Sequence, residues 1–511
     1  MPLDTVLDII AYGAWNGGTP VDNSIYEQKG LSFKGGIPVN HKTIEERIGV
    51  RTRVVAPLDE RIGASALQNL LDTSDIDPGR IKVVIGATNV GDDKSDSGPL
   101  IRHPYHLIRE YCPKALVLDL YAGCPGFNVA VELDFMLSLT GFLNEGDIAI
   151  IVGAENIHRA QAFKPHDTAN IIFGDDAVAT ALETRNGITP EGHYENPRRD
   201  EFEIQNDIVL ELAQKIHALN GNTKFDGLII DNQIGDLPHR VPATASRVQH
   251  ALVELMFPDE ASRGVFKKFK DALDFYDQNV QAFAYDIMTL DADPKHVEAV
   301  ARAYVESGKF ENVVSVFLGR DRRGIISLHT GKNFSFKAPR TGIIDTHTRT
   351  HGCFARYIQA LPDNGDVFGD MDGKGVFLYA TRGAKSHLNT LLSGNGTKLE
   401  DLDLIIEHQA NFAMIPLTLE QVLEADPPEM KTAVADLIAN KMVTNVHERG
   451  NCSVVCMQRL PYDLQRGALN PDSIQGFAIN RNLDVLKRAN LTLNDSVGAG
   501  MTRSAFVHRK R

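Results

Sequence analysis

One stretch, residues 126–142, restricts the possible folds most strongly. It is apolar on nearly all sides, and only Glu132 and Asp134 interrupt the pattern. This is typical of a helix that is buried on most of its faces. Such a helix needs other elements packed on every side, so we expect it at the centre of a layered fold.

Apolar runs of strand length alternate with longer helical patterns along the chain. Runs at residues 83–87, 116–120, 148–152 and 402–406 are rich in β-formers and are bounded by polar residues or glycine. This alternation predicts an α/β protein.

Charge and cysteine content exclude several classes of protein. The 511 residues carry a formal charge of -14, which argues against a nucleic-acid or anionic-membrane surface. The first fifteen residues do not resemble a signal peptide, and no apolar run approaches the length of a membrane span. Five scattered cysteines without a CxxC pair favour free thiols in a reducing compartment. We therefore expect a cytoplasmic protein that binds neither nucleic acid nor membrane.

The segment from about residue 185 to 324 differs in character from the rest. It opens on HYENPRRDEFEIQND and contains charged helical stretches at residues 263–273 and 296–307. We interpret it as an insertion or extra subdomain. The predicted division is an N-terminal half at 1–184, the insertion with its linker at 185–339, and a C-terminal half at 340–511.

Two distant segments have similar sequences. TKFDGLIIDNQ, residues 223–233, matches TKLEDLDLIIEHQ, residues 397–409, if a gap of two residues is allowed, and Asn232 then aligns with His408. A degenerate repeated half is one explanation. Any helix–turn–strand unit of an α/β protein can produce the same pattern, and we favour this coincidence.

Cys124 is the first candidate for chemistry. It stands between a predicted strand and the buried helix, in LVLDLYAGCPGF. Unpaired N–H groups at a helix N-terminus stabilise a thiolate, which is the reactive form of cysteine. Pro125 suits the first helical position because it lacks an N–H group. A buried cysteine is more often inert packing when it is judged alone.

His408 and Asn451 are two further candidates. His408 follows a buried strand in LDLIIEHQANF, and loops at the ends of parallel strands are where α/β folds place catalytic groups. Asn451, in ERGNCSVV, offers two N–H donors that do not ionise. Alone, the histidine is more often structural, and the asparagine is equally well explained as a helix N-cap.

A glycine-rich tail adds a weaker signal. Gly498, Ala499 and Gly500 allow backbone amides to approach a reacting carbonyl closely.

Taken in this order, the segments resemble the ketoacyl-acyl carrier protein synthase III family of the thiolase superfamily. Cys124 in AGCPGF corresponds to the family's nucleophile, His408 in HQAN to its histidine and Asn451 in GNCS to its asparagine. GAGMT resembles its terminal oxyanion loop, and RIGVRTR at 47–53 and NIIFGDDAVATAL at 170–182 are similar to further segments. The resemblance covers residues 1–184 and 340–511.

This resemblance implies a five-layer αβαβα sandwich of two related halves, expected as a homodimer. It implies an acyltransferase without a permanent cofactor, whose substrates are acyl-CoA or acyl carrier protein thioesters and malonyl-ACP or malonyl-CoA. Cys124 would form an acyl-enzyme whose carbonyl oxygen is held by the N–H groups of Cys124 and Ala499. His408 and Asn451 would then assist a decarboxylative condensation, and Arg47, Gly498 and Gly500 would contact substrate.

The sequence departs from the family at several places. Pro125 replaces a small residue, Ala499 interrupts a glycine run, and no tryptophan stands next to Arg47. Residues 91–106 do not resemble the family's acyl-pocket loop. The unusual pocket loop and the insertion favour a specialised lipid or secondary-metabolite pathway over primary fatty-acid biosynthesis.

Other functions stay open at this point. The same fold could condense thioesters without decarboxylation, or pass the acyl group to an oxygen or nitrogen acceptor. A papain-like hydrolase also uses Cys, His and Asn, and a silent partner subunit is a further alternative. His347, His351 and Cys353 could be read as metal ligands, but we interpret them as ordinary loop residues and expect no metal.

Overall fold

The computed structural model describes residues 4–33, 35–90, 114–186, 190–234, 237–423 and 426–511. Residues 91–106, where the pocket loop departs from the family, and Cys112 lie outside the described residues. Within the described part of the chain, no helix is both long enough and apolar enough to span a bilayer.

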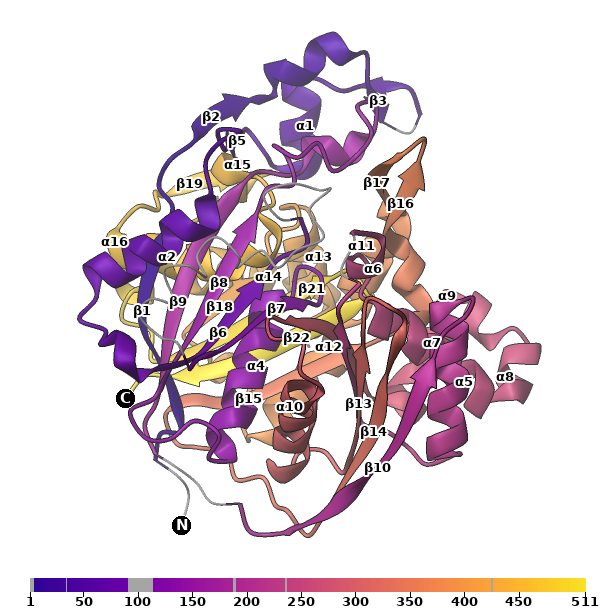
Figure 1. Ribbon diagram of the computed structural model, residues 1–511. Coiled ribbons are helices and arrows are strands. Elements are labelled where there is room, and N and C mark those ends of the chain that lie inside the picture. Colours follow the sequence, from indigo (N-terminus) through magenta and orange to yellow (C-terminus); the bar gives the residue numbers. More distant parts are fainter. Residues whose placement is uncertain (1–3, 34, 91–113, 187–189, 235–236, 424–425) are drawn as a thin grey trace.

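A mixed sheet of ten strands forms the main body of the protein (Figure 1). Its first five strands lie in the order β1-β9-β8-β6-β7. β6, β7 and β8 are parallel, whereas β9 is antiparallel to both β8 and β1. Three predicted strands are confirmed. The bounds are β1 (Leu7–Ala14), β6 (Ile81–Ala87), β7 (Leu116–Tyr121), β8 (Ile148–Glu155) and β9 (Asp176–Thr184).

The segment interpreted as an insertion continues this sheet. β12 pairs antiparallel with β7, and the order runs on as β12-β11-β13-β14-β10. The segment from 193 to 332 is therefore joined to the N-terminal strands by backbone hydrogen bonds. Its strands are β10 (His193–Glu203), β11 (Gly227–Asn232), β12 (Phe283–Thr289), β13 (Asn312–Leu318) and β14 (Arg323–Lys332).

A second sheet belongs to the C-terminal part of the chain. Its order is β15-β22-β21-β18, and a single parallel bridge joins Ile405 of β18 to Met442 on the other side. The predicted strand at residues 402–406 is confirmed as β18. The strands are β15 (Gly342–Thr350), β18 (Leu404–Glu407), β21 (Leu491–Gly498) and β22 (Thr502–Arg509).

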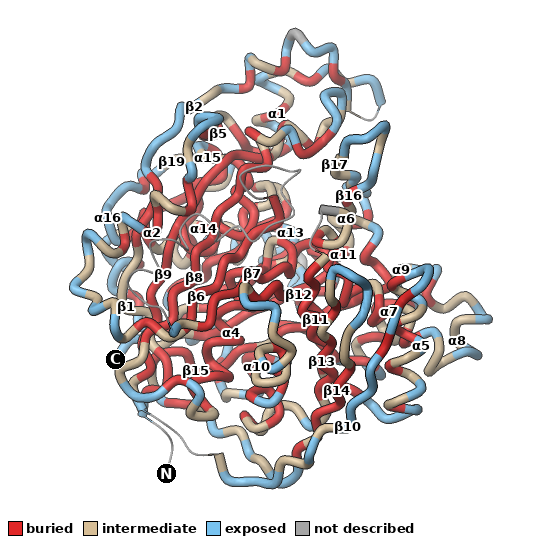
Figure 2. Tube along the Cα trace, in the orientation of Figure 1, coloured by how far each residue is buried: buried red, intermediate tan, exposed pale blue. Residues whose placement is uncertain are grey.

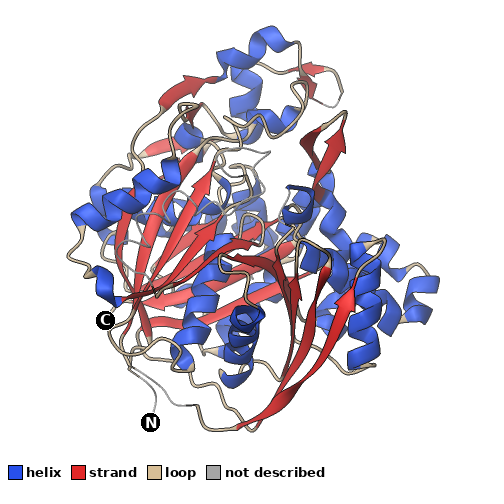
Figure 3. Ribbon diagram, in the orientation of Figure 1, coloured by secondary structure: helices blue, strands red, loops and turns tan. Residues whose placement is uncertain are grey.

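The two sheets enclose a layer of helices. α4 (Gly126–Leu139) contacts β6 and β8 of the large sheet as well as β15, β21 and β22 of the small one, and α16 (Cys456–Arg466) packs beside it. α2 (Ile62–Thr73) covers the outer face of the large sheet, and α12 (Ala384–Gly394) covers the outer face of the small one. The layers are therefore helix, sheet, helix, sheet and helix, as expected (Figure 3).

The alternation of side chains along the strands explains this layering. In β6, Val83 and Ile85 join the hydrophobic cluster of α4, whereas Val84 joins the cluster of α2. Every residue of α4 is buried, which confirms the predicted central helix (Figure 2). Burial raises the pKa of both Glu132 and Asp134, so these two acids are stabilised in their neutral forms.

Several shorter elements surround these layers. The predicted helix at residues 296–307 is confirmed as α10, but that at 263–273 is broken, and only α9 continues from it. Small two-stranded ribbons pair β2 with β5, β3 with β4, β16 with β17 and β19 with β20. The ribbon strands are β2 (Thr19–Asp22), β3 (Ser32–Phe33), β4 (Ile37–Pro38), β5 (Thr52–Val55), β16 (Ile358–Asp363), β17 (Asp366–Met371), β19 (Asp472–Ile474) and β20 (Phe477–Ile479). The further helices are α1 (His41–Ile48), α5 (Ile208–Asn220), α6 (Leu237–Arg240), α7 (Thr244–Met256), α8 (Pro258–Ser262), α9 (Phe269–Phe275), α10 (Pro294–Glu306), α11 (Gly373–Arg382), α13 (Met414–Val422), α14 (Pro427–Lys441), α15 (Val446–Arg449) and α17 (Leu483–Leu486).

The interpretation of residues 347–353 as a loop is wrong in part. His347 lies within β15, because a run with alternating threonines suits a strand. Its ring packs on that of His387, with centroids 4.7 Å apart, whereas His351 contacts the Tyr379 hydroxyl at 2.9 Å. Each histidine has a different neighbour. Among the described residues, no group of three side chains is placed to hold a metal ion.

Asp286 on β12 anchors α7 to the sheet. Its buried carboxylate accepts hydrogen bonds from the N–H groups of Thr244 (2.9 Å) and Ala245 (2.8 Å) and from the Asn232 amide (3.1 Å). We expect Asp286→Ala to lower the free energy of unfolding by about 3 kcal/mol, because buried donors lose their acceptor. Urea denaturation measures this change. Replacement of the exposed Asp200 by Ala is the control and should change stability by less than about 0.5 kcal/mol. Equal midpoints for the two variants would contradict this role of Asp286.

Candidate active site

Cys124 lies in the short loop between β7 and α4, where two glycines allow another loop to approach its backbone. A Cβ atom on Gly498 would lie 2.5 Å from the Cys124 nitrogen, and one on Gly123, whose φ is 71°, would lie 2.5 Å from the Ala499 nitrogen. Any side chain at either position would separate the two loops. Pro125 is the N-cap residue of α4, one position before the expected first turn.

The structure brings Cys124, His408 and Asn451 to the wall of one cavity. Cys124 follows β7, His408 follows β18, and Asn451 precedes the helical segment that leads into α16. Gly498 lines the same cavity, so four of the predicted site residues converge. The other lining residues are Ile172, Phe173, Ile358, Met371, Gly373, Val376, Phe377, Ala410, Asn411, Met414, Val497 and Met501.

His408 is neutral in this environment. Burial, reinforced by the nearby Arg503 guanidinium, lowers the pKa of His408 to about 3. Its backbone N–H donates to the Asp495 carbonyl at 2.9 Å, which fixes the position of the residue. Nδ1 is buried without a hydrogen-bond partner among the described residues, so Nε2 is the ring nitrogen available to a bound substrate. A neutral imidazole with its proton on Nε2 is a hydrogen-bond donor.

Asn451 is oriented by its own side-chain oxygen. Oδ1 accepts a hydrogen bond from the Ser453 backbone N–H at 2.7 Å, and the Asn451 N–H donates to the Ile172 carbonyl at 2.8 Å. The side-chain oxygen thus caps the backbone locally, which agrees with the alternative interpretation of Asn451 as a helix N-cap. Because the oxygen is occupied, the side-chain NH₂ group is the part that can donate to a ligand.

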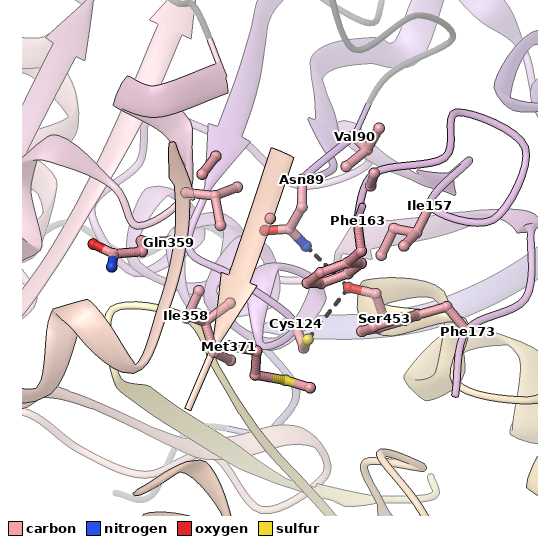
Figure 4. Close-up of a pocket in the computed structure, with 15 residues that line it drawn as sticks. Asn89, Val90, Cys124, Ile157, Phe163, Phe173, Ile358, Gln359, Met371 and Ser453 are labelled. Atoms are coloured by element: carbon pink, nitrogen blue, oxygen red, sulfur yellow. Dashed lines mark hydrogen bonds between the residues drawn. The ribbon is translucent and has the colours of Figure 1, made fainter. Parts of the chain in front are cut away.

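Three further polar residues next to Cys124 were missed by the sequence reasoning. The Ser453 hydroxyl donates to Cys124 Sγ at 3.3 Å and accepts from the Asn89 amide at 2.9 Å (Figure 4). The same amide donates to Glu155 at 2.7 Å. Asn89 and Glu155 lie at the carboxyl ends of the parallel strands β6 and β8, and this placement is the signal that could have identified them.

The protonation of Cys124 differs from the expectation of a thiolate. Burial raises the pKa of the Cys124 thiol to about 12, the Ser453 hydrogen bond lowers it, and the Glu155 charge raises it. Burial also raises the pKa of Glu155 to about 7. The resting sulfur is therefore a thiol, and the carboxyl of Glu155 is close to half ionised at neutral pH.

A second cavity adjoins the first, with which it shares Cys124, Phe173, Ile358 and Met371, and its lining is almost entirely apolar. Phe163 and Phe173 stack with ring centroids 5.4 Å apart, and the β16–β17 hairpin supplies Ile358 and Met371 (Figure 4). Such a lining suits a hydrocarbon group attached to the sulfur. The remaining lining residues are Asn89, Val90, Ile157, Ala162, Val241, Gln359, Ala360, Gly369, Ser453 and Ala499.

Of the three other predicted site residues, Ala499, Gly500 and Arg47, only Ala499 is among the residues that line these cavities. Ala499 lines the apolar cavity, and Gly500, with φ 126°, follows it in the same loop. Arg47 is exposed near the end of α1 and is not among the described residues that line either cavity. α1 is held against the loop after His408, because the Phe412 N–H donates to the Ile48 carbonyl at 2.8 Å.

The fold and the converging side chains define a thiolase-like protein with a cysteine at the centre of its site. Among solved structures, 3-oxoacyl-[acyl-carrier-protein] synthase III from Aquifex aeolicus matches with a TM-score of 0.53 and 15% identity, over 98% of this chain and 99% of that one. OleA from Xanthomonas campestris matches with a TM-score of 0.51 and 10% identity, over 100% of this chain. At these identities the likeness establishes the fold.

Sequence comparison leads to the same family. The beta-ketoacyl-[acyl-carrier-protein] synthase III of Helicobacter pylori strain J99 is 27% identical over 249 residues, which is 44% of this chain and 66% of the relative, just under two thirds. The enzyme of the same name from Erythrobacter litoralis is 27% identical over 158 residues, 30% of this chain and 46% of that one. No protein-family model matches the chain. The chain thus resembles the ketoacyl synthase III-like family of thiolase-fold condensing enzymes, as the motifs predicted.

The high pKa of Cys124 leads to a test of its reactivity. We expect alkylation of Cys124 by iodoacetamide to accelerate about tenfold per pH unit between pH 7 and 9, because the thiolate fraction rises in this proportion below the pKa. Ser453→Ala should slow the reaction at each pH, since the hydrogen bond that lowers the pKa is removed. Intact-protein mass spectrometry measures both rates, and Cys124→Ala gives the background from the other cysteines. A rate that levels off below pH 9 would contradict the raised pKa.

Proposed function

We propose that this protein is a ketoacyl synthase III-like condensing enzyme that forms an acyl-enzyme on Cys124 and joins it to a malonyl thioester by decarboxylative Claisen condensation. The observation that carries the proposal is the convergence of Cys124, His408 and Asn451 on one cavity within a thiolase-like fold. The substrates are acyl-CoA or acyl-ACP and malonyl-CoA or malonyl-ACP, and no permanent cofactor takes part.

In the first half-reaction, the Cys124 sulfur attacks the carbonyl carbon of an acyl thioester. The carbon–sulfur bond to the carrier breaks, and the carrier thiol leaves with the proton that Cys124 gives up. The backbone N–H groups of Cys124 and Ala499 hold the developing oxyanion, and the glycine contacts keep these two loops adjacent. Each such donor commonly contributes about 3 kcal/mol to the transition state. The hydrogen bond from Ser453 stabilises the thiolate as it forms.

In the second half-reaction, His408 and Asn451 donate hydrogen bonds to the thioester oxygen of the malonyl group. Loss of carbon dioxide leaves an electron pair that these donors stabilise as an enolate. The enolate carbon attacks the acyl carbonyl, the bond to Cys124 breaks, and a proton from solvent restores the thiol. A neutral histidine suits this role because it donates a hydrogen bond without protonating the enolate.

The apolar cavity next to Cys124 holds the acyl chain in this proposal. Arg47, exposed on α1 beside the loop after His408, binds the phosphate of the carrier or of coenzyme A. Gly498 and Gly500 allow the thioester to approach closely. We assign the enzyme to a specialised lipid or secondary-metabolite pathway in the cytoplasm rather than to primary fatty-acid biosynthesis, on the departures in its sequence.

A second candidate function is thioester condensation without decarboxylation, or acyl transfer to an oxygen or nitrogen acceptor. Glu155 favours it, because burial places the pKa of this carboxyl at about 7 and a base of this strength can accept a proton at neutral pH. Its hydrogen bond to Asn89, which lines the apolar cavity, places it one side chain from the substrate. Decarboxylation needs no such base.

Intact-protein mass spectrometry with a panel of acyl-CoA thioesters tests the proposal. We expect wild type to gain the mass of an acyl group, Cys124→Ala to gain none, and added malonyl-CoA or malonyl-ACP to discharge the adduct with release of carbon dioxide. His408→Ala and Asn451→Ala should still be acylated but should discharge about 10²- to 10³-fold more slowly, since each removes one donor to the enolate.

The outcomes separate the candidate functions. An adduct that malonyl thioesters do not discharge, but that a second acyl thioester or an amine or alcohol does, would favour the second candidate. Acylation of Cys124→Ala to the same extent as wild type would refute Cys124 as the nucleophile. Absence of any adduct in wild type would leave the silent partner subunit as the better explanation.

A further inference from the structure

The ten-stranded sheet has the same strand order from either edge. When each set of five strands is numbered along the chain, β1, β6, β7, β8 and β9 lie in the order 1-5-4-2-3. The strands β10 to β14 then continue as 3-2-4-5-1. In both sets, strand two is parallel to strands three and four, and strand five is antiparallel to strands four and one.

The C-terminal sheet repeats this arrangement a third time. In the same numbering, strands one, two, four and five of this unit are β15, β18, β21 and β22, and their relative directions are the same as in the other two sets. The position of strand three is marked by the parallel bridge to Met442. β11 and β18 are therefore both second strands. The similarity between residues 223–233 and 397–409 thus has a structural basis, which favours a degenerate repeat over the coincidence that we expected.

The helices follow the same plan. α2, α5 and α12 each come after strand one of their unit and pack against its strands one and five. α4, α10 and α16 each come between places three and four. Three units of one topology, rather than two halves and an unrelated insertion, account for this order (Figure 1).

A local twofold axis relates the first two units. Leu120 of β7 lies opposite Ala87 in its own unit, and Ile287 of β12 lies opposite Asp231. Ala87 and Asp231 occupy corresponding positions. Asn89 follows Ala87 by two residues, and Gln233 follows Asp231 by two residues, so each lies two residues before an amide side chain at the end of strand two. Leu120 and Ile287 then pair directly with each other across the β7–β12 joint. A joint in which equivalent residues meet has the isologous form of a homodimer interface.

The middle unit, residues 193–332, carries none of the proposed catalytic side chains at the corresponding places. It contains no cysteine. The N-cap of α10, the place that Pro125 holds at α4, is Asp293, whose carboxylate accepts from the Lys295 N–H at 3.0 Å. Asn232 aligns with His408, but its amide is buried and donates to Asp286 at 3.1 Å. Both side chains have structural roles.

The middle unit nevertheless reaches the site of the first unit. Val241 lines the apolar cavity beside Cys124, and its carbonyl accepts a hydrogen bond from the Ala360 N–H of the β16–β17 hairpin at 2.7 Å. The Arg240 guanidinium lies over the ring of Tyr121, three residues before Cys124, at 5.1 Å. A Cβ on Gly500 would lie 3.0 Å from the Ser246 hydroxyl of α7, so the oxyanion loop also packs on this unit.

We infer that the middle unit is a third copy of the repeated unit that takes, within one chain, the place of a second subunit against β7, and that its Val241 forms the wall limiting the acyl group on Cys124. The chain is accordingly a monomer, in contrast to the homodimer that the resemblance implies. The limit that Val241 sets on the acyl group rests on the proposed function, whereas the monomeric state of the chain and the position of Val241 in the cavity wall do not.

Sedimentation of the full chain tests the substitution for a subunit. The expected mass is 56.2 kDa at micromolar concentrations, because the edge of β7 is already paired with β12. Twice this mass would overturn the inference that the middle unit replaces a second copy.

The wall is tested by the size of reagent that reaches Cys124. We expect Val241→Phe to slow modification by long alkyl methanethiosulfonates at least tenfold relative to the methyl reagent, and Val241→Ala to favour the long reagents. Intact-protein mass spectrometry measures these ratios. Leu210→Ala is the matched control, because Leu210 is 48% exposed on α5 of the same unit and lies away from the cavity.

The outcomes of the two experiments remain distinguishable. Unchanged ratios in both Val241 variants, with unfolding midpoints equal to that of wild type, would overturn the role of Val241. If wild type accepts acyl groups, the acyl-CoA panel should shift in the same direction as the alkyl reagents, and an unshifted panel would refute the link to acyl size. If wild type accepts none, the proposed function fails, while the reagent ratios still decide whether Val241 forms the wall.

Discussion

The close approach of two backbone loops at Cys124 is the constraint on which the site depends. Gly498, at the end of β21, and Gly123, in the loop after β7, have no side chains, so the C-terminal sheet can bring its amides against the loop that carries Cys124. The layer of α4 and α16 sets the spacing of the two sheets that carry these loops. His408 and Asn451 reach the same cavity from the C-terminal part because this spacing is kept.

The electrostatics of the site follow from its burial. A sulfur, an imidazole and a carboxyl are all held in their neutral or nearly neutral forms because their charged forms lose hydration. The pKa of Cys124 is raised to about 12, that of Glu155 is raised to about 7, and that of His408 is lowered to about 3. Such a site stabilises charge that develops during a reaction rather than charge that is present at rest. This property agrees with acyl transfer and enolate chemistry, in which negative charge develops transiently on the substrate's carbonyl oxygens.

The sequence predicted the parts of the fold and site that depend on local pattern. The buried helix and four strands followed from periodicity, whereas the grouping of Cys124, His408 and Asn451 was implied by the family resemblance of their short motifs. Ser453, Asn89 and Glu155 were missed because the hydrogen bonds that link them to Cys124 and to one another join segments far apart in the sequence. The middle unit was interpreted as an insertion because the order of strands in a sheet depends on tertiary pairing and cannot be read from local sequence patterns. Only the short similarity between residues 223–233 and 397–409 pointed to it.

The β7–β12 joint has a consequence for the evolution of the protein. In a symmetric dimer of identical chains, every substitution in a wall residue is also a substitution in the unit that bears the nucleophile, so one sequence must satisfy both duties. Here the two sides of the joint are encoded separately, and the middle unit contains no cysteine. Residues such as Val241 are free to vary without any matching change around the sulfur. Under the proposed function, the selection of a substrate and the chemistry performed on it thus belong to different units of one chain.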